Sequence, residues 1–277
     1  MKIAVVTVVS GRHEHLTAQL HGLRRSSIPP SEHIVVSMGD EDITDVVRGA
    51  GSDATVIRMD TSGPRLPLAS ARNLGARTAM GHCADLIVFL DVDCIPGVDM
   101  LARYAAAADV DCEGGGGRSL LCGPVTYLPP SPSGWSADAL LAATDPHPAR
   151  PNPPPNTVLV GTDYDLFWSL SFASTPSTWQ VTGGFEEDYA GYGGEDTDFA
   201  ATAQAADVGL LWVGGAHAYH QYHPVSSPPV ERLDDIIRNS ALFHRRWNRW
   251  PMTGWLDEFE RRGLIERNDS GEIRRIG

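Results

Sequence analysis

Two compact clusters of acidic residues stand out in the sequence, each beside backbone that is able to bend. The first holds Asp91 and Asp93 in the segment FLDVDCIP, and the second holds Glu195, Asp196 and Asp198 in YGGEDTDF. Carboxylate oxygens are the ligands that Mg²⁺ and Mn²⁺ prefer, and Mg²⁺ often binds substrate phosphates as well. A carboxylate also acts as a general base on a hydroxyl group within hydrogen-bonding distance. The clusters therefore predict a metal site and a proton acceptor.

Each cluster also has an interpretation without chemistry. Asp91 and Asp93 flank one residue, so in an extended strand end both carboxylates point to the same side. They could bind a metal ion together with a diphosphate, or they could simply lie in a solvated turn. We favour the metal. Glu195 and Asp196 follow a pair of glycines and begin a predicted helix, where acidic residues are favoured as caps. Capping leaves the second glycine unexplained, whereas paired glycines let the backbone approach a ligand closely.

Three histidines follow the last apolar strand segment, at intervals of three residues: His217, His220 and His223. Histidine is a frequent ligand of transition metals, so one of them is a candidate to complete a site begun by Asp91 and Asp93. A zinc site built from all three is the competing hypothesis. Side chains at this spacing in a loop or strand end do not all face one point, so we expect one ligand rather than three.

The residues around these clusters alternate between strand and helix patterns. Continuous apolar, β-branched runs predict buried parallel strands, and apolar residues at helical spacing predict helices between them. Such alternation indicates an α/β fold with a parallel sheet and helices on both faces, in which ligands bind beyond the carboxyl ends of the strands. The expected strands are 2–9, 33–38, 54–59 and 85–90, and the expected helices are 13–25, 44–50, 67–82 and 100–108.

The pattern changes after residue 109. Residues 129–155 hold nine prolines and little periodicity, which is typical of a lid, a binding loop or a disordered segment. We expect a flexible turn at 111–118, strands at 120–128, 167–172 and 209–213, helices at 195–206 and 231–250, and a frayed end at 261–277. Trp247, Trp250 and Trp255 lie near this end, and packing of a terminal helix explains them more simply than contact with a membrane or partner.

Composition narrows the function classes. The chain has 277 residues and a formal net charge of −13, which argues against a nucleic-acid-binding protein because such proteins need a basic face. The four cysteines form no CxxC pair, which favours free thiols in a reducing compartment. No apolar run approaches the roughly 20 residues of a membrane span. We therefore predict a cytoplasmic protein without a transmembrane segment. Peripheral contact with a membrane is compatible with this prediction.

Five segments in order resemble the GT-A glycosyltransferases, in particular glycosyltransferase family 2 and the C-terminal region of β-1,4-galactosyltransferases. VVTVVSGRHEHL is similar to the opening strand and nucleotide-binding turn, LASARNLGARTA to the following helix, and FLDVDCIP to the D-x-D metal motif. GGFEEDYAGYGGEDTDF resembles the acceptor-side motif, an aromatic residue followed by Gly-Gly-Glu-Asp, and HAYHQYH stands where such enzymes place a metal-binding histidine. The resemblance covers about residues 2–225.

The resemblance implies a GT-A fold, Rossmann-like with a mixed, mostly parallel central sheet, and a transferase that moves a sugar from a nucleoside-diphosphate sugar to an acceptor hydroxyl with inversion. A UDP-linked hexose is the expected donor, and a carbohydrate or small molecule the acceptor. Mn²⁺ or Mg²⁺ would be held by Asp91, Asp93 and one histidine, for which we prefer His220 and then His223. The free cysteines and missing anchor resemble a bacterial cytoplasmic member.

The same resemblance assigns roles to further residues. Asp196 would remove the acceptor proton, and Glu195 would hydrogen-bond the acceptor or sugar. Trp168 and Tyr192 would stack on sugar rings or are core aromatics, and Gly194 would lie at the acceptor. The residues expected at the nucleotide are Thr7, Ser10, Arg12, Asp40, Arg72 and Asp91. Asp40 stands in SMGDED, where the family has paired acids.

The implied catalytic domain spans residues 1–228, with a donor half at about 1–110 and an acceptor half at about 111–228 that includes a proline-rich loop at 129–157. A helical extension at 229–277 follows. Three alternatives stay open: a nucleotidyltransferase that makes a nucleotide-sugar, a non-catalytic nucleotide- or sugar-binding module, and a retaining transferase. The segment SGRHEHL is poorer in glycine than the phosphate loop of a nucleotidyltransferase.

Overall fold

A mixed eight-stranded sheet forms the centre of the protein, which is described here by a computed structural model covering residues 1–61, 63, 65–114 and 116–276. The strand order is β3-β2-β1-β4-β9-β6-β10-β8. The four strands β3, β2, β1 and β4 are mutually parallel, β9 is antiparallel to both of its neighbours, and β8 is antiparallel to β10. The strands are β1 (Ile3–Val9), β2 (Glu32–Met38), β3 (Thr55–Met59), β4 (Leu86–Leu90), β6 (Ser119–Cys122), β8 (Val158–Gly161), β9 (Ser171–Ser174) and β10 (Gly209–Val213).

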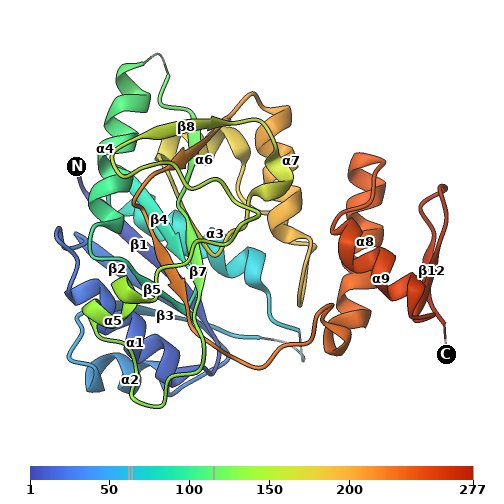
Figure 1. Ribbon diagram of the computed structural model, residues 1–277, viewed down its shortest axis with the longest axis horizontal. Helices are drawn as coiled ribbons and strands as arrows, with labels where there is room; N and C mark the ends of the chain where they lie inside the picture. The colour runs from blue at the N-terminus through green and yellow to red at the C-terminus, as the bar shows by residue number, and fades with distance from the viewer. Residues whose placement is uncertain (62, 64, 115, 277) are drawn as a thin grey trace.

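Helices cover both faces of this sheet, as Figure 1 shows. Alternate residues of β1 point to opposite faces: Val6 packs in the core cluster that includes α3 (Leu68–Gly81) and α7 (Glu195–Ala205), whereas Val5 packs with α4 (Met100–Glu113). The end of β1, at Val9, packs with α1 (His13–Arg24) and α2 (Ile43–Gly49). The predicted α/β class and mostly parallel sheet are confirmed.

A second, three-stranded sheet joins distant parts of the chain. Its order is β5-β11-β7, with β5 (Cys94–Pro96), β11 (Ala218–His220) and β7 (Val125–Tyr127). The expected single strand 120–128 is wrong: it divides into β6 and β7, which belong to different sheets, with Gly123 between them. Since His220 pairs with Cys94, this sheet brings the histidine segment beside the first acidic cluster.

Other expectations need correction. The expected turn at 111–118 is partly helical, because α4 continues to Glu113, and residue 115 lies outside the described residues. The strand expected at 167–172 lies at Ser171–Ser174 instead. The proline-rich segment contains α5 (Ala137–Ala142) and packs on the sheet through Arg150, whose guanidinium lies 5.1 Å from the ring of Trp168 and 4.8 Å from that of Trp212.

The residues after β11 form a unit with its own core, which we call the C-terminal unit: α8 (Leu233–Trp247), α9 (Thr253–Arg261) and the hairpin β12 (Ile265–Arg267) and β13 (Ile273–Arg275). Figure 1 shows it beside the main α/β body. The expectation of a frayed end at 261–277 is therefore wrong for the described residues, which exclude 277; β12 and β13 pair antiparallel. Among the described residues, no helix is both long and apolar enough to cross a bilayer. The four cysteines are free, as expected.

Candidate active site

The first acidic cluster lies in the turn between β4 and β5. The side-chain amide of Gln19, on α1, donates hydrogen bonds to the carbonyl oxygens of Asp91 (2.7 Å) and Cys94 (3.0 Å). The hydroxyl of Thr7 donates to Gln19 Oε1 (2.8 Å) and contacts His33 Nε2 (3.0 Å). Thr7 is fully buried, so it supports this turn from below instead of lining the nucleotide pocket assigned to it from the sequence.

Asp93 meets two histidines. Its carboxylate oxygens lie 3.6 Å from His220 Nε2 and 3.6 Å from His223 Nε2, and the three candidate ligand atoms lie within 4.8 Å of one another. Burial and the neighbouring Arg12 guanidinium lower the pKa of His223, which favours the neutral imidazole that binds metals. One carboxylate and two imidazoles are a donor set suited to a divalent transition metal such as Mn²⁺.

The composition of this metal-compatible cluster differs from the one expected. The chain brings in His223 as well as His220, because it turns back directly after β11. Asp91 instead points one oxygen at Arg72, at 2.9 Å. His217 is buried, and its Nε2 lies 2.7 Å from the hydroxyl of Thr126. As expected, the three histidines do not all face one point. Two of them, His220 and His223, do meet at Asp93, where one was expected.

Arg72 joins the two acidic clusters. The residue is 3% exposed, and its guanidinium contacts Asp91 Oδ1 at 2.9 Å through one nitrogen and Glu195 Oε1 at 3.3 Å through another. The guanidinium also lies 5.3 Å from the ring centre of Phe185. Two neighbouring carboxylates would repel each other without such a cation, so Arg72 allows both clusters to lie at the same edge of the sheet.

Glu195 and Asp196 begin α7 in a poorly solvated environment. Burial, followed by the charge of Asp196, raises the pKa of Glu195 to about 7. Burial also raises the pKa of Asp196, against hydrogen bonds from Thr197, whose amide donates to Oδ1 at 2.8 Å. A carboxylate with a raised pKa is a stronger proton acceptor. The third acid, Asp198, is fully buried and accepts from Trp247 Nε1 at 2.7 Å, so it has a structural role.

The expected nucleotide side contains a second polar cluster. Asp40 accepts hydrogen bonds from the Gly11 amide (2.8 Å) and from His13 Nε2 (2.9 Å). Burial alone would raise the pKa of Asp40, but these hydrogen bonds outweigh burial, so the pKa is lowered. Ser10 and Arg12 lie in the same turn after β1, and Arg12 reaches to 3.6 Å from Asp93. The structure thus brings Ser10, Arg12 and Asp40 together at the carboxyl ends of β1 and β2.

The residues expected at the acceptor lie in two different environments. Tyr192 is 38% exposed, and its ring stacks on Trp255 of α9 with centroids 5.9 Å apart. Trp168 is partly buried between the sheet and the proline-rich segment, against His147 and Arg150. Gly194 precedes Glu195, and a side chain there would meet Tyr189 and Asn239. Sequence reasoning gave no role to Gln19 and Asn239, which lie outside every motif, or to His13, which lies within VVTVVSGRHEHL. Only their contacts identify these three residues.

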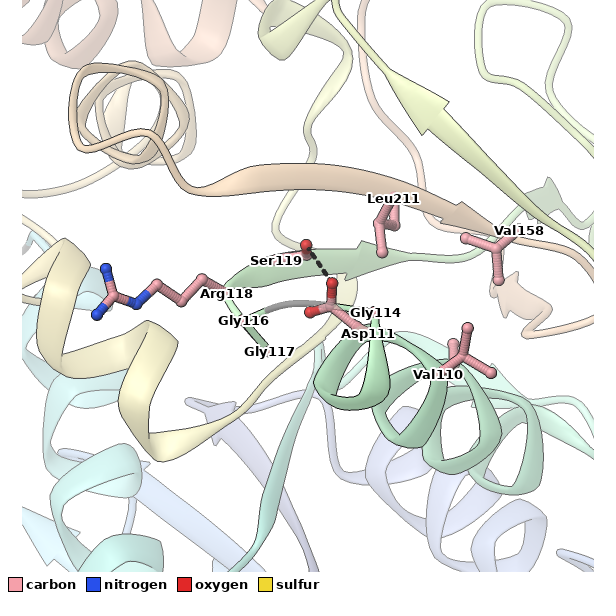
Figure 2. A pocket seen from close by; sticks show the side chains of 10 residues that line it. Val110, Asp111, Gly114, Gly116, Gly117, Arg118, Ser119, Val158 and Leu211 are labelled. Atoms are coloured by element: carbon pink, nitrogen blue, oxygen red, sulfur yellow. Dashed lines mark hydrogen bonds between the residues drawn. The ribbon is translucent and has the colours of Figure 1, made fainter.

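A cavity of about 420 Å³ lies away from these residues (Figure 2). It is lined by Val110 and Asp111 of α4, the start of β6 at Ser119, and Val158 and Leu211. Figure 2 shows Asp111 bonded to Ser119 and Arg118 pointing away. Strand β6 is antiparallel to β9, which is antiparallel to β4, so its start lies at the sheet edge opposite the acidic clusters. This cavity is separate from the candidate site.

One segment of the chain matches a known protein family. Residues 160–224 match the family model described as the N-terminal domain of galactosyltransferase, and this segment includes Glu195, Asp196, His220 and His223. The curated proteins contain no match to the chain.

Solved glycosyltransferase structures share the fold. S. aureus TarS 1–349 in complex with UDP-GlcNAc has a TM-score of 0.61 at 13% identity, covering 88% of this chain and 66% of that one. TarS 1–349 alone has a TM-score of 0.57 at 16% identity, over 88% and 65%. GalNAc-T7 with UDP, GalNAc and Mn²⁺ has a TM-score of 0.56 at 16% identity, over 88% and 50%. This chain therefore spans two thirds or less of the length of these structures, and the likeness establishes its GT-A fold.

Proposed function

We propose that this protein is a metal-dependent glycosyltransferase that moves a hexose from a nucleoside-diphosphate sugar, with UDP as the nucleotide, to an acceptor hydroxyl with inversion. The observation that carries the proposal is the Arg72 bridge. One buried guanidinium contacts Asp91 at 2.9 Å through one nitrogen and Glu195 at 3.3 Å through the other, so the proposed diphosphate side and the proposed proton-accepting side meet at the same group. A displacement between two substrates needs this adjacency.

Different residues serve the two substrates. Asp93, His220 and His223 would hold Mn²⁺ or Mg²⁺, and Asp91 would support them; when bound, the ion offsets the charge of the leaving diphosphate. Ser10, Arg12 and Asp40 would bind the nucleotide. The fold relatives support this reading, because a TarS structure contains UDP-GlcNAc and the GalNAc-T7 structure contains UDP and Mn²⁺.

Asp196 is the proposed general base. It accepts the proton of the acceptor hydroxyl while that oxygen forms a bond to the anomeric carbon. The bond from the anomeric carbon to the diphosphate oxygen breaks, and its electron pair leaves with the nucleoside diphosphate. Attack from the face opposite the leaving group inverts the configuration. Glu195, held by Arg72, would orient the acceptor or the sugar beside the base.

Calorimetry with UDP, GDP, CDP and dTDP, with and without Mn²⁺, tests the donor side. We expect Mn²⁺-dependent binding of UDP, and its loss in Asp93→Ala, because that carboxylate lies between both histidines. Release of UDP from UDP-glucose or UDP-galactose then tests for transfer. A folded protein that binds none of the four nucleotides contradicts the proposal, and release of pyrophosphate from UTP and a sugar phosphate would indicate a nucleotidyltransferase instead.

A further inference from the structure

The segment that precedes the candidate base has little regular structure of its own. We call residues 190–194 the glycine loop; it leads directly into Glu195 and Asp196. Its backbone groups are bound by side chains of α8. Asn239 Nδ2 lies 2.7 Å from the Gly193 carbonyl, 3.3 Å from the Tyr192 carbonyl and 3.4 Å from the Ala190 carbonyl. Asn239 is fully buried, so these loop carbonyls are its main partners.

A second residue of α8 binds the same loop. The Tyr192 amide donates to Asp235 Oδ2 at 3.3 Å. The other oxygen of Asp235 accepts from Arg65 Nε and Arg238 Nη1, each at 3.0 Å. The carboxylate is thus fixed between two cations while it holds the loop. The C-terminal unit therefore determines where the glycine loop lies.

The glycines of the loop face neighbouring side chains and not open space, and at Gly191 and Gly193 these side chains belong to the C-terminal unit. Gly191, Gly193 and Gly194 all have positive φ (75°, 88° and 91°). A Cβ at Gly191 would lie 2.3 Å from Asp235 Oδ2, and one at Gly193 would lie 3.1 Å from Met252 Sδ. Besides the approach of a ligand that the sequence suggests, the small residues leave room for Asp235 of α8 and for Met252, the residue before α9.

Tyr192 links the C-terminal unit to the site. One face of its ring stacks on Trp255 at an interplanar angle of 21°, and 38% of the residue is exposed. Tyr192 stands three residues before Glu195 and four before Asp196 in the chain, and burial together with the charges of these two acids raises the pKa of Tyr192. Trp255 therefore fixes an aromatic ring at the edge of the proposed acceptor site.

We propose that the C-terminal unit is part of the active centre: Asn239 positions the glycine loop and hence the acids, and Trp255 positions Tyr192 as a wall for a pyranose ring of the acceptor. Both are positioning residues, because neither touches the reacting atoms. The inference rests on the proposed function. Loss of either residue should therefore impair transfer and acceptor use while nucleotide binding, which depends on the ends of β1, β2 and β4, is retained.

Asn239→Asp tests the loop. The substitution keeps the volume but turns carboxylate oxygens toward three carbonyls, which should displace the loop. Asn268→Asp is the matched control, because Asn268 lies in the β12–β13 hairpin of the same unit and donates to Glu272 at 2.7 Å. We expect faster hydrogen exchange in residues 190–196 and about 10- to 100-fold slower UDP release from UDP-galactose, with Mn²⁺–UDP affinity within about twofold of the parent.

Trp255→Ala tests the wall. Trp250→Ala is its control, since Trp250 also packs in the C-terminal unit but lies against His244, with ring centroids 4.4 Å apart. Methyl pyranosides of glucose, galactose and N-acetylglucosamine serve as probe acceptors, with glycerol as an open-chain probe. We expect pyranosides to accelerate UDP release more than glycerol does. Trp255→Ala should raise the pyranoside KM about 2- to 10-fold, and Trp255→Phe should restore most of this loss.

The outcomes separate this inference from the proposed function. If Asn239→Asp and Asn268→Asp show the same exchange in residues 190–196, the positioning role is wrong, whatever the enzyme transfers. If Trp255→Ala and Trp250→Ala change the pyranoside KM equally, or if glycerol is as good a probe as the pyranosides, the wall is wrong. Failure to bind nucleotide in the unsubstituted protein would overturn the proposed function and this inference with it.

Discussion

The two sides of the candidate site are built in different ways. On the donor side, Asp91, Asp93 and Asp40 follow strands of the central sheet, and Gln19 of α1 holds the turn between β4 and β5 through two hydrogen bonds. On the acceptor side, the acids follow a loop whose backbone is held by α8, more than 40 residues later in the chain. The sheet fixes the proposed donor side, whereas a separate helical unit fixes the proposed acceptor side.

This difference predicts that the two sides respond separately to substitution. Buried parallel strands are among the most rigid parts of a fold, and residues at their ends keep their positions when distant helices change. A loop held by side-chain hydrogen bonds depends on each of those bonds. Binding of the nucleotide should therefore survive substitutions on the acceptor side. The variants below test this expectation, beginning with the one that should have the largest effect.

Asp196→Asn should have the largest effect. It removes the proposed proton acceptor but keeps the side chain's shape, so we expect kcat to fall by about 10²- to 10⁴-fold. UDP release from UDP-galactose in the presence of a pyranoside measures this fall. Calorimetry should show unchanged Mn²⁺–UDP binding, since Asp93 and both histidines are untouched. Asp198→Asn is a poor substitute as a control, because Asp198 holds Trp247 and Arg246.

Two results would contradict this expectation. Unchanged turnover in Asp196→Asn would exclude it as the base. Loss of UDP binding in the same variant would show that the two sides are not independent, and that the Arg72 bridge transmits the change from α7 to Asp91.

The next effect is the acid sensitivity of the donor side. His33 is buried, and burial lowers its pKa to about 4, although Asp53 opposes this shift. The Thr7 hydroxyl donates to Gln19, so its oxygen accepts from His33 Nε2, and burial keeps the imidazole neutral at pH 7. An unfolded chain binds the proton near pH 6.5, so stability is complete above that pH and is lost as the pH falls toward 4. The loss reaches about 3 kcal/mol.

Urea unfolding at pH 7, 5.5 and 4 measures this loss. We expect His33→Gln to remove the corresponding part of the pH dependence, even if the variant is less stable at pH 7. His82→Gln is the control, because His82 pairs with Glu32 at the surface and is about half exposed. Equal pH dependence of stability in the parent and His33→Gln would show that the hydrogen-bonded group of His33, Thr7 and Gln19 does not contribute to the acid sensitivity.

The same difference between the two sides explains what the sequence could predict. Strands β1 to β4 have long apolar runs with clear ends, so the sheet, its direction and the position of Asp91 and Asp93 follow from local pattern. Helix α7 was also expected within one residue of its end. These features depend on residues near one another in the chain.

Features made by long-range pairing could not be predicted. Strand β5 has three residues and β7 has three, too few for a periodic signal, and only their pairing with β11 places His223 beside Asp93. The strand expected at 120–128 failed for the same reason. Arg72 lies in LASARNLGARTA, whose resemblance assigns it to the nucleotide and not to a bridge between Asp91 and Glu195. Asn239 lies outside every motif, so the bridge and the held loop become visible only from contacts.

The third prediction separates the histidines. His220→Ala and His223→Ala should each weaken Mn²⁺-dependent UDP binding by about 10- to 100-fold, since each nitrogen lies 3.6 Å from Asp93. His217→Ala is the matched control, because its Nε2 is taken by Thr126 at 2.7 Å. Calorimetric titration at fixed Mn²⁺ compares the three. Equal loss in all three variants would indicate damage to β11 and not loss of a metal ligand.

The smallest effect compares one glycine from each side. Gly11 and Gly191 both have positive φ (63° and 75°), which costs an alanine about 1–2 kcal/mol. A Cβ at Gly11 meets nothing within 4 Å, whereas one at Gly191 lies 2.3 Å from Asp235 Oδ2, and that carboxylate is held by two arginines. Gly191→Ala should therefore be less stable than Gly11→Ala by about 1–2 kcal/mol in urea unfolding.

Activity completes this comparison. Gly11→Ala should weaken UDP binding, because the Gly11 amide donates to Asp40 at 2.8 Å and strain there moves the nucleotide turn. Gly191→Ala should leave UDP binding intact and slow transfer, because it displaces the loop before Glu195. If both variants reduce UDP binding to the same extent, the glycine loop and the strand ends form one cooperative unit, and the division between a sheet-built donor side and a helix-held acceptor side is wrong.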